Sequence, residues 1–302
     1  MTVLCVLNPT AGRGGRRLTA KVVALLRERG ADVVLHETAR RGDAERLADA
    51  AARGDPSLGP GKIEVIAVAG GDGTINEVAN GLLGSDIPIA VIPSGTANVL
   101  AYEIGLRPDA RRIVDTILNG RAVTCWPGLL GGRCFVAMVG AGFDARIVAA
   151  INPAVKEWIG KGAYALAGLP VFFGAHPSNY KVVIDGEVFE AAWVVAAKTH
   201  YYAGRYVLAP GASLSAPSLR LFLLQVPGRF ALLRTLIGIA FGRVEKVRGV
   251  RLLDGKSVQI TRLNGESGAS DPVEADGDLA GCLPAEIAIA PKNVKILTPS
   301  GS

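Results

Sequence analysis

A glycine-rich turn between two apolar segments constrains this chain more than any other feature. Residues 63–69 (IEVIAVA) form a short β-branched run, typical of a strand that is buried on both faces. Residues 70–74 (GGDGT) hold too many glycines for a helix or a strand, and residues 75–83 return to helical spacing. Thr74 and Glu77 have the spacing of a capping box, which predicts a helix that starts at Thr74.

This strand–turn–helix unit predicts a phosphate site. Glycines let the backbone approach a ligand closely, and a helix start offers unpaired N–H groups at the positive end of the helix dipole. The two familiar glycine motifs do not fit, because a Rossmann loop needs glycine where Asn76 stands and a Walker loop needs Gly-Lys-Ser/Thr. A tightly packed corner without a ligand is the alternative interpretation.

Charge and composition limit the classes of molecule that this chain is expected to bind. The net charge of +6 and the pI of about 9.2 favour nucleotides, anionic lipid headgroups or nucleic acid. An aromatic content of 6% and the lack of an RNA-binding signature argue against nucleic acid. The four cysteines are scattered, which favours a reducing cytoplasm over a disulfide framework or metal cluster. No apolar run reaches the ~18 residues needed to cross a bilayer, so we expect any membrane contact to be peripheral.

Strands and helices alternate in the first part of the chain. Apolar runs predict strands over 3–7, 31–37, 63–69 and 87–92, with helices ending near residues 29, 52, 83, 103 and 118. This alternation predicts a doubly wound, mostly parallel sheet with helices on both faces. Glycine-bearing loops follow three of the strands, so we expect them to gather at the edge where such sheets bind ligands.

The pattern changes near residue 124, after which strands dominate. Asp-Gly pairs at Asp185–Gly186, Asp254–Gly255 and Asp276–Gly277 each lie between two strand-like runs and predict hairpins. We therefore expect an antiparallel β-sandwich over 124–291, beside a nucleotide-binding α/β domain over 1–123. The strand expected at 293–297 would bring residues 292–302 back to the α/β domain.

Two helices are expected within the second domain, over 154–173 and 230–241. The second (FALLRTLIGIAF) is apolar with arginines near its polar edge. Both a core-packed helix and a membrane contact fit this pattern.

Several motifs together resemble one family. They are Asn8-Pro9 with Gly12 and Gly14, Thr38 followed by Gly42–Ala44, and the segments 70–77, 93–98 (PSGTAN), 142–145 (GFDA) and 276–277. In this order they resemble the bacterial diacylglycerol kinase/sphingosine kinase catalytic family, the soluble lipid kinases. NAD kinases share the GGDGT loop, but the PSGTAN segment looks like the lipid-kinase version.

The resemblance implies an α/β domain like that of NAD kinase and phosphofructokinase, and ATP bound between it and the β-sandwich. The nucleotide contacts that it implies are Asn8, Pro9, Thr10, Ala11, Gly12, Thr38, Gly70, Gly71, Asp72, Gly73, Thr74, Ile75, Asn76 and Thr96. It implies Asp276 as the general base, Asp144 as a second catalytic residue and Asp72 as a ligand of the nucleotide's Mg²⁺. Asp276 also suits a plain hairpin turn, and Asp72 also suits a turn cap.

One segment departs from the family pattern. Relatives with a separate structural Mg²⁺ carry Asp-Gly-x-Leu-Asp after Ala-Pro-x-Ala. Here Ala209–Ala212 is followed by APSLR at 216–220, which lacks both carboxylates. Without hard oxygen ligands we expect no structural Mg²⁺ there, and Arg220 is a candidate for a fixed positive charge in its place.

The function expected from this resemblance is transfer of the γ-phosphate of ATP to a lipid hydroxyl, by a cytoplasmic enzyme at the inner face of the membrane. Two alternatives stay open: a nucleotide- or lipid-binding regulator without turnover, and a kinase of a soluble substrate such as NAD. Exposed sheet edges would allow a homodimer.

Overall fold

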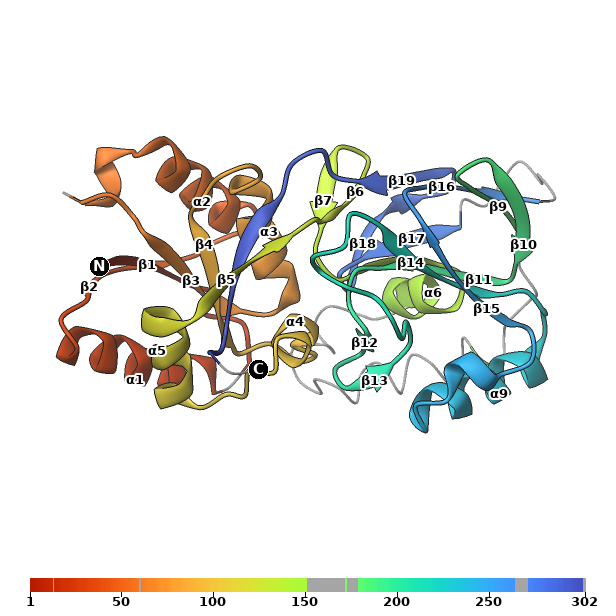
Figure 1. Cartoon of the computed structure of the whole chain (residues 1–302), viewed down its shortest axis with the longest axis horizontal. Coiled ribbons are helices and arrows are strands. Elements are labelled where there is room, and N and C mark those ends of the chain that lie inside the picture. Colours follow the sequence, from red (N-terminus) through yellow and green to blue (C-terminus); the bar gives the residue numbers. More distant parts are fainter. Residues whose placement is uncertain (13, 60, 151–171, 173–178, 264–270, 301–302) are drawn as a thin grey trace. The chain divides into compact units, whose positions relative to one another are not determined.

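The computed structural model describes residues 1–12, 14–59, 61–150, 172, 179–263 and 271–300. The chain divides into two compact units, Met1–Trp126 with Pro291–Ser302, and Pro127–Ala290 (Figure 1). The boundary expected at 123/124 falls inside strand β5, so the chain leaves the first unit after Trp126. The helix expected over 154–173 lies, apart from Phe172, outside the described residues.

The first unit contains a six-stranded sheet in the order β2-β1-β3-β4-β20-β5. Its strands are β1 (Thr2–Leu7), β2 (Asp32–Glu37), β3 (Val65–Gly70), β4 (Pro88–Pro93), β5 (Arg121–Cys125) and β20 (Val294–Thr298). All neighbours pair in parallel except β20 and β5. The prediction of a mostly parallel sheet is confirmed, and the last strand of the chain does return to it.

Helices cover both faces of this sheet. They are α1 (Gly15–Glu28), α2 (Asp43–Arg53), α3 (Asp72–Gly81), α4 (Val99–Glu103) and α5 (Ala110–Asn119), with a short 3₁₀ turn at Pro56–Leu58. Helices α1 and α5 pack together on one face, and α2 and α3 on the other (Figure 1). The central strands β1 and β3 are buried almost throughout, as their β-branched sequences indicate.

The predicted capping box of α3 is wrong. The helix begins at Asp72 with Gly71 as its N-cap, so Thr74 already lies within the first turn. Glu77 reaches across to α2 instead, where its carboxylate accepts the N–H of Ala44 at 3.3 Å. A glycine N-cap leaves the first N–H groups of α3 without a side-chain partner, which suits a ligand site.

The second unit is an antiparallel sandwich of two six-stranded sheets in its described part. One sheet has the order β10-β9-β16-β19-β6-β7, with strands Glu187–Ala191, Tyr180–Ile184, Ser257–Arg262, Ala285–Ile289, Gly128–Leu130 and Arg133–Phe135. The other has the order β15-β14-β11-β8-β17-β18, with strands Val250–Gly255, Leu219–Leu224, Trp193–Ala197, Met138–Ala141, Pro272–Ala275 and Asp278–Cys282. Alternate residues of both sheets fill one apolar core, so the predicted sandwich is confirmed.

Two strand predictions in this unit need correction. The run expected as one strand after Asp185–Gly186, residues 188–196, forms two strands, β10 and β11, which lie in different sheets. The expected hairpin at Asp254–Gly255 does not exist, because β15 and β16 also belong to different sheets and do not pair. The chain crosses between the sheets there, and Asp185 binds the crossing by accepting the N–H groups of Lys256 and Ser257.

In the described part of this unit, the smaller elements are the β12–β13 hairpin (Tyr201–Tyr202 and Tyr206–Val207), helix α6 (Phe143–Ala150), helix α9 (Arg229–Ala240) and a 3₁₀ turn at Val244–Lys246. The hairpins at Asp185–Gly186 and Asp276–Gly277 form as predicted, and both aspartates have positive φ, 46° and 50°. In the part of the chain that the structure describes, no helix is both long and apolar enough to cross a bilayer.

Candidate functional site

Three loops at the carboxyl ends of β1, β3 and β4 touch one another in the first unit. The side-chain amide of Asn8 donates to the hydroxyl of Thr74 at 3.0 Å, which joins the first loop to the second. A Cβ atom added at Gly95 would lie 2.4 Å from the Cα of Gly71, so the second and third loops meet backbone to backbone. The predicted gathering of the glycine loops is therefore observed, and the glycines permit it.

The first loop is tightly ordered by its own residues. The side-chain oxygen of Asn8 accepts both the N–H and the hydroxyl of Thr10, at 3.0 and 2.9 Å. Pro9 and Ala11 complete the turn, and the N–H of Gly12 bonds to the carbonyl of Thr10. Thr38, at the end of β2, is anchored to the carbonyl of Leu7 and lies at the same edge of the sheet.

The side chains around the start of α3 differ in what they can offer a ligand. Gly70, Gly71 and Gly73 present only backbone, and Ile75 is 1% exposed, so its side chain belongs to the core. Asn76 is half-buried and accepts from Asn80, and Thr96 is half-buried in the third loop. At the start of α3, the predicted residues therefore offer a ligand mainly backbone groups.

Two buried polar atoms in the third loop point to a bound group. Within the described ranges, Ser94 Oγ and Asn98 Oδ1 have no hydrogen-bond partner. Asn98 is held at φ 51° while its amide donates to the carbonyl of Gly95 at 2.9 Å. Buried polar atoms are almost always bonded, so a nucleotide that bonded these two would remove an unfavourable feature. Neither residue was predicted as a contact, although both lie in the PSGTAN motif.

Asp72 is buried, and both of its carboxylate oxygens accept backbone N–H groups. Oδ2 accepts from Val99 and Oδ1 from Leu100, each at 3.1 Å, so the side chain holds the start of α4. Burial raises the pKa of Asp72, and these hydrogen bonds oppose the rise. Its oxygens fit direct coordination of Mg²⁺ poorly while they make these bonds, and the described residues contain no cluster of three or more metal-ligating side chains. The assignment of Mg²⁺ to Asp72 stays a prediction.

The loop geometry predicts a large effect of Gly12→Ala. Gly12 has φ 71°, and an added Cβ atom would lie 2.2 Å from the backbone oxygen of Ser94. We expect the variant to lose about 1–3 kcal/mol of stability and to bind ATP more weakly, because the first and third loops must separate. Thermal melting with and without ATP measures both. Gly14→Ala is the matched control, since Gly14 has φ −97° and open space around it; equal behaviour of the two variants would contradict the prediction.

In the second unit, Asp276 lies at the tip of the β17–β18 hairpin, and its carboxylate binds the segment that leads into β8. Oδ2 accepts the N–H of Val136 at 2.9 Å, and Oδ1 accepts those of Ala137 and Met138 at 2.9 and 2.8 Å. Three backbone donors fix the position of this carboxylate. A fixed carboxylate suits a general base, and it also suits a structural turn, so geometry alone leaves both interpretations open.

Two further acidic residues lie near Asp276: Glu274 on β17 of the same hairpin, and Asp144 in α6. Glu274 is directly across from Gly140 in the β17–β8 pairing, so both face the same side of the sheet. A Cβ atom added at Gly140 would lie 1.9 Å from Asp144 Oδ2, which means that glycine leaves the space for that carboxyl. Glu274 also accepts the N–H of Gly277 at 2.9 Å. We call Asp144, Glu274 and Asp276 the acidic corner.

Burial is the main cause of the raised pKa values of Asp144 and Glu274. It raises the pKa of Asp144 to about 7, while the Ala145 N–H opposes the rise. Burial raises the pKa of Glu274 well above its ordinary value, and the nearby charge of Asp144 raises it further. Both side chains are at most 3% exposed. In the folded chain the pair therefore holds its protons to a higher pH than it would in the unfolded chain. Sequence reasoning missed Glu274, whose only signal is its position two residues before Asp276.

A buried lysine lies at the segment that departs from the family pattern. Lys198 is 0% exposed, and its ammonium donates to the carbonyl oxygens of Ala216 and Ser218 at 2.5 and 2.8 Å. The Lys198 side chain therefore ties β11 to residues 216–218, which the sequence pattern did not indicate.

Arg220, the predicted source of positive charge, also lies at this segment. Its Nε donates to the carbonyl of Pro210 at 3.0 Å, and its guanidinium pairs with Asp254 at 2.9 Å. It thus joins the Ala-Pro-x-Ala loop to β15, since Arg220 and Asp254 face each other across the β14–β15 pairing.

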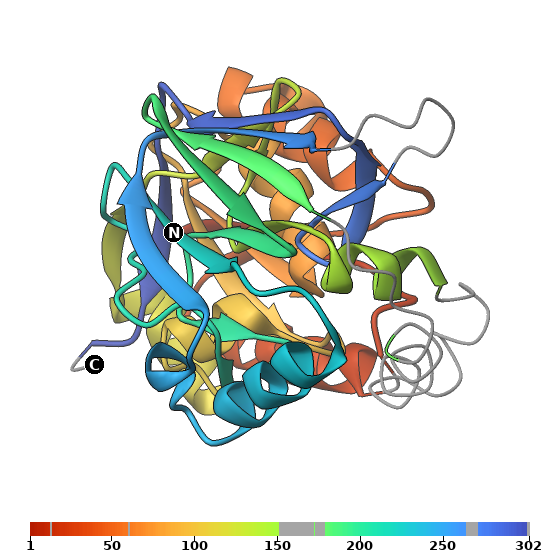
Figure 2. The same cartoon turned by 90° about the vertical axis from the view of Figure 1, so that its right-hand side faces the viewer.

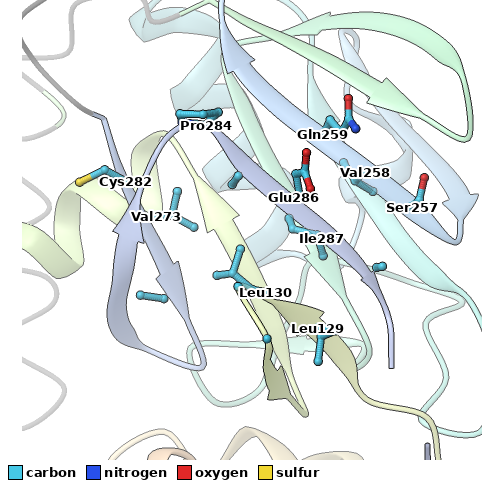
Figure 3. A pocket seen from close by; sticks show the side chains of 15 residues that line it. Leu129, Leu130, Ser257, Val258, Gln259, Val273, Cys282, Pro284, Glu286 and Ile287 are labelled. Carbon is cyan, nitrogen blue, oxygen red and sulfur yellow. The ribbon is translucent and has the colours of Figure 1, made fainter. Parts of the chain in front are cut away.

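A hollow of about 590 Å³ lies elsewhere on the second unit (Figure 3). Its lining is mostly apolar, including Leu129, Leu130 and Ile287, with the polar side chains of Gln259 and Glu286. No member of the acidic corner lines it. We therefore do not assign this hollow to the chemistry.

Comparison with known proteins agrees with this two-part arrangement. Residues 2–126 match the diacylglycerol kinase catalytic domain, and residues 137–298 match the YegS C-terminal NAD kinase beta sandwich-like domain. The chain is 28% identical over 300 residues to the diacylglycerol kinase of Bacillus subtilis, with 97% of this chain and 95% of the relative covered. It is 29% identical over 311 residues to the diacylglycerol kinase of Mycobacterium tuberculosis, with 98% of this chain and 95% of the relative covered.

Solved structures support the fold. The crystal structure of a diacylglycerol kinase from Bacillus anthracis matches with a TM-score of 0.77 at 24% identity, covering 98% of this chain and 96% of that one. Because the family models cover both units, and the relatives match along almost the whole length, the chain belongs to the diacylglycerol kinase catalytic family of kinases.

Proposed function

We propose that this protein is an ATP-dependent lipid kinase that transfers the γ-phosphate to the hydroxyl of a lipid, with diacylglycerol as the first candidate. The observation that carries the proposal is the meeting of the loops at Asn8, Gly71 and Gly95 at the start of α3. Such an edge binds phosphate through backbone N–H groups. The names of the relatives make diacylglycerol the first lipid to test.

The chain's own residues would divide the work between the units. In the first unit, the loops hold the triphosphate. The nucleotide would also give hydrogen-bond partners to Asn98 Oδ1 and Ser94 Oγ, which have none within the described residues. In the second unit, the carboxylate of Asp276 accepts the proton of the lipid hydroxyl. The hydroxyl oxygen attacks the γ-phosphorus, and the bond from the γ-phosphorus to the ADP leaving group breaks. Phosphoryl transfer needs chiefly such positioning and charge neutralisation, with one carboxylate for the proton. Mg²⁺ would arrive with the nucleotide and neutralise phosphate charge, and no protein cage for it is proposed.

A second candidate is a nucleotide- or lipid-binding regulator without turnover. The observation that favours it is the lack of both carboxylates in residues 216–220. It differs from the kinase in one measurable respect, because ATP would bind without loss of its γ-phosphate.

The deciding experiment uses purified protein, radioactive ATP with Mg²⁺, and separate reactions with diacylglycerol, phosphatidylglycerol, a sphingoid base and NAD. We expect label in a lipid, identified by mass spectrometry, and none in NAD. Labelled NAD would support a soluble substrate instead. Tight ATP binding with no labelled product in any reaction, or in a whole-membrane lipid extract, would support the regulator.

A further inference from the structure

Helix α9 leaves one apolar face uncovered in the second unit. The side that packs on the sandwich carries Ala231, Leu232, Thr235, Gly238 and Ile239. The opposite side carries four large apolar side chains that recur every three or four residues and therefore form one stripe. They are Phe230, Leu233, Ile237 and the C-cap Phe241, which are 88%, 45%, 50% and 77% exposed. Figures 1 and 2 show α9 lying outside the two sheets.

The orientation of this stripe is set by close packing beneath it. A Cβ atom added at Gly238 would lie 2.3 Å from a methyl group of Val247, so the helix rests directly on the segment that follows it. Arg234 donates to the carbonyl of Arg248 at 2.5 Å, and the chain turns sharply after the helix at Gly242, where φ is 63°. These contacts hold the stripe on the outside. Single exposed apolar residues are ordinary, but a contiguous stripe marks an interaction surface.

The charges around the stripe indicate what it contacts. Residues 229–243 contain three exposed arginines, Arg229, Arg234 and Arg243, and no acidic residue. The whole chain carries a net charge of +6. An amphipathic helix with aromatic residues on its apolar side and arginines beside them binds an anionic lipid surface.

The size of the stripe favours a bilayer over a second copy of the chain. Two phenylalanines and two half-exposed aliphatic side chains offer on the order of 400 Å², about half of what each partner contributes to a stable protein interface. A bilayer requires no complementary shape, and an insertion of this size is sufficient for reversible binding.

We propose that α9 docks the protein on anionic membranes, with the α9 stripe (Phe230, Leu233, Ile237 and Phe241) among the acyl chains and the arginines at the lipid phosphates. The proposal rests on the proposed function in one respect, that a kinase of membrane lipids must meet its substrate at the bilayer. It names the element that makes this contact.

Sedimentation with vesicles tests the proposal without ATP. The double variant Phe230→Ser/Phe241→Ser removes the most exposed parts of the stripe, and we expect its affinity for vesicles of phosphatidylcholine with phosphatidylglycerol to fall at least tenfold. Arg229→Gln should weaken binding to the same vesicles about fivefold and leave binding to pure phosphatidylcholine unchanged. Val188→Ser is the matched control, because Val188 is 60% exposed on β10 and should not matter. Thermal melting verifies that each variant is folded.

Unchanged vesicle binding by the double variant overturns the proposal, as does a wild-type dimer that the double variant dissociates while its vesicle binding persists. Activity separates this inference from the kinase function. If wild type and double variant phosphorylate lipid in vesicles equally, the kinase stands and the docking helix fails. If no lipid is phosphorylated but vesicle binding still depends on Phe230 and Phe241, the kinase fails and the docking helix stands.

Discussion

Asp276→Asn is expected to lower lipid phosphorylation by a factor of about 10²–10⁴ while ATP still binds, because the amide cannot accept the hydroxyl proton. Initial rates of phosphate transfer and ATP binding by calorimetry measure the two properties separately. The substitution has a structural cost as well. The carboxylate accepts three backbone N–H groups, and an amide nitrogen facing one of them would lose that hydrogen bond at a cost of about 1–3 kcal/mol.

The chain provides a matched control for this structural cost. Asp185 also precedes a glycine in a hairpin turn, has φ 46° against 50° for Asp276, and accepts the backbone N–H groups of Lys256 and Ser257. Asp185→Asn should therefore destabilise the second unit to a similar extent without lowering the rate. Such a pair of results would distinguish a catalytic carboxylate from one that only stabilises a turn.

The opposite result is equally informative. If Asp276→Asn keeps turnover within a few fold of wild type, Asp276 is not the base and its three hydrogen bonds are purely structural. If both variants lose turnover in proportion to their loss of stability, the effect at position 276 comes from unfolding.

Local sequence was sufficient for most of the first unit, because neighbouring residues specify most of its elements; strand β5 (Arg121–Cys125) was not predicted. The run 63–69 is β-branched and apolar, the glycines at 70–73 end it, and the parallel sheet follows from the repetition of this unit. Even in this unit, the predicted start of α3 at Thr74 was two residues too late. Thr74 and Glu77 have the spacing of a capping box, but both side chains bind partners distant in sequence, Asn8 and Ala44.

Local sequence predicted the second unit less well, because the sheet to which a strand belongs depends on pairing between residues far apart in the chain. The Asp254–Gly255 pair resembles the Asp185–Gly186 hairpin locally, but β15 pairs with β14 and β16 with β9, so no hairpin forms. For the same reason, the sequence did not predict the buried positions of Glu274 and Lys198. Nothing near them in sequence shows that Glu274 faces Asp144 over Gly140, or that Lys198 is fully buried against residues 216–218.

Glu274→Gln is expected to reduce the fall in stability with rising pH that the raised pKa values of Asp144 and Glu274 predict for the wild type. In the unfolded chain Asp144 and Glu274 ionise near pH 4. In the folded chain burial raises the pKa of Asp144 to about 7, and burial together with the charge of Asp144 raises that of Glu274 well above its ordinary value. From about pH 4 to 7 and beyond, the folded state therefore binds more protons than the unfolded state. The free energy of unfolding falls as pH rises through this window.

Glutamine preserves the shape and the acceptor for the Gly277 N–H while it cannot ionise. We expect the variant to match wild type near pH 4.5 and to exceed its stability at pH 8, by roughly 1.4 kcal/mol for each unit by which the pKa of Glu274 is raised, up to that pH. Urea denaturation at several pH values measures the difference. Glu286→Gln is the control, since Glu286 is exposed on β19 and its removal should leave the pH dependence as in wild type. If Glu274→Gln has the wild-type slope, the buried carboxyl pair does not retain its proton, and the acidic corner must carry its full negative charge beside Asp276.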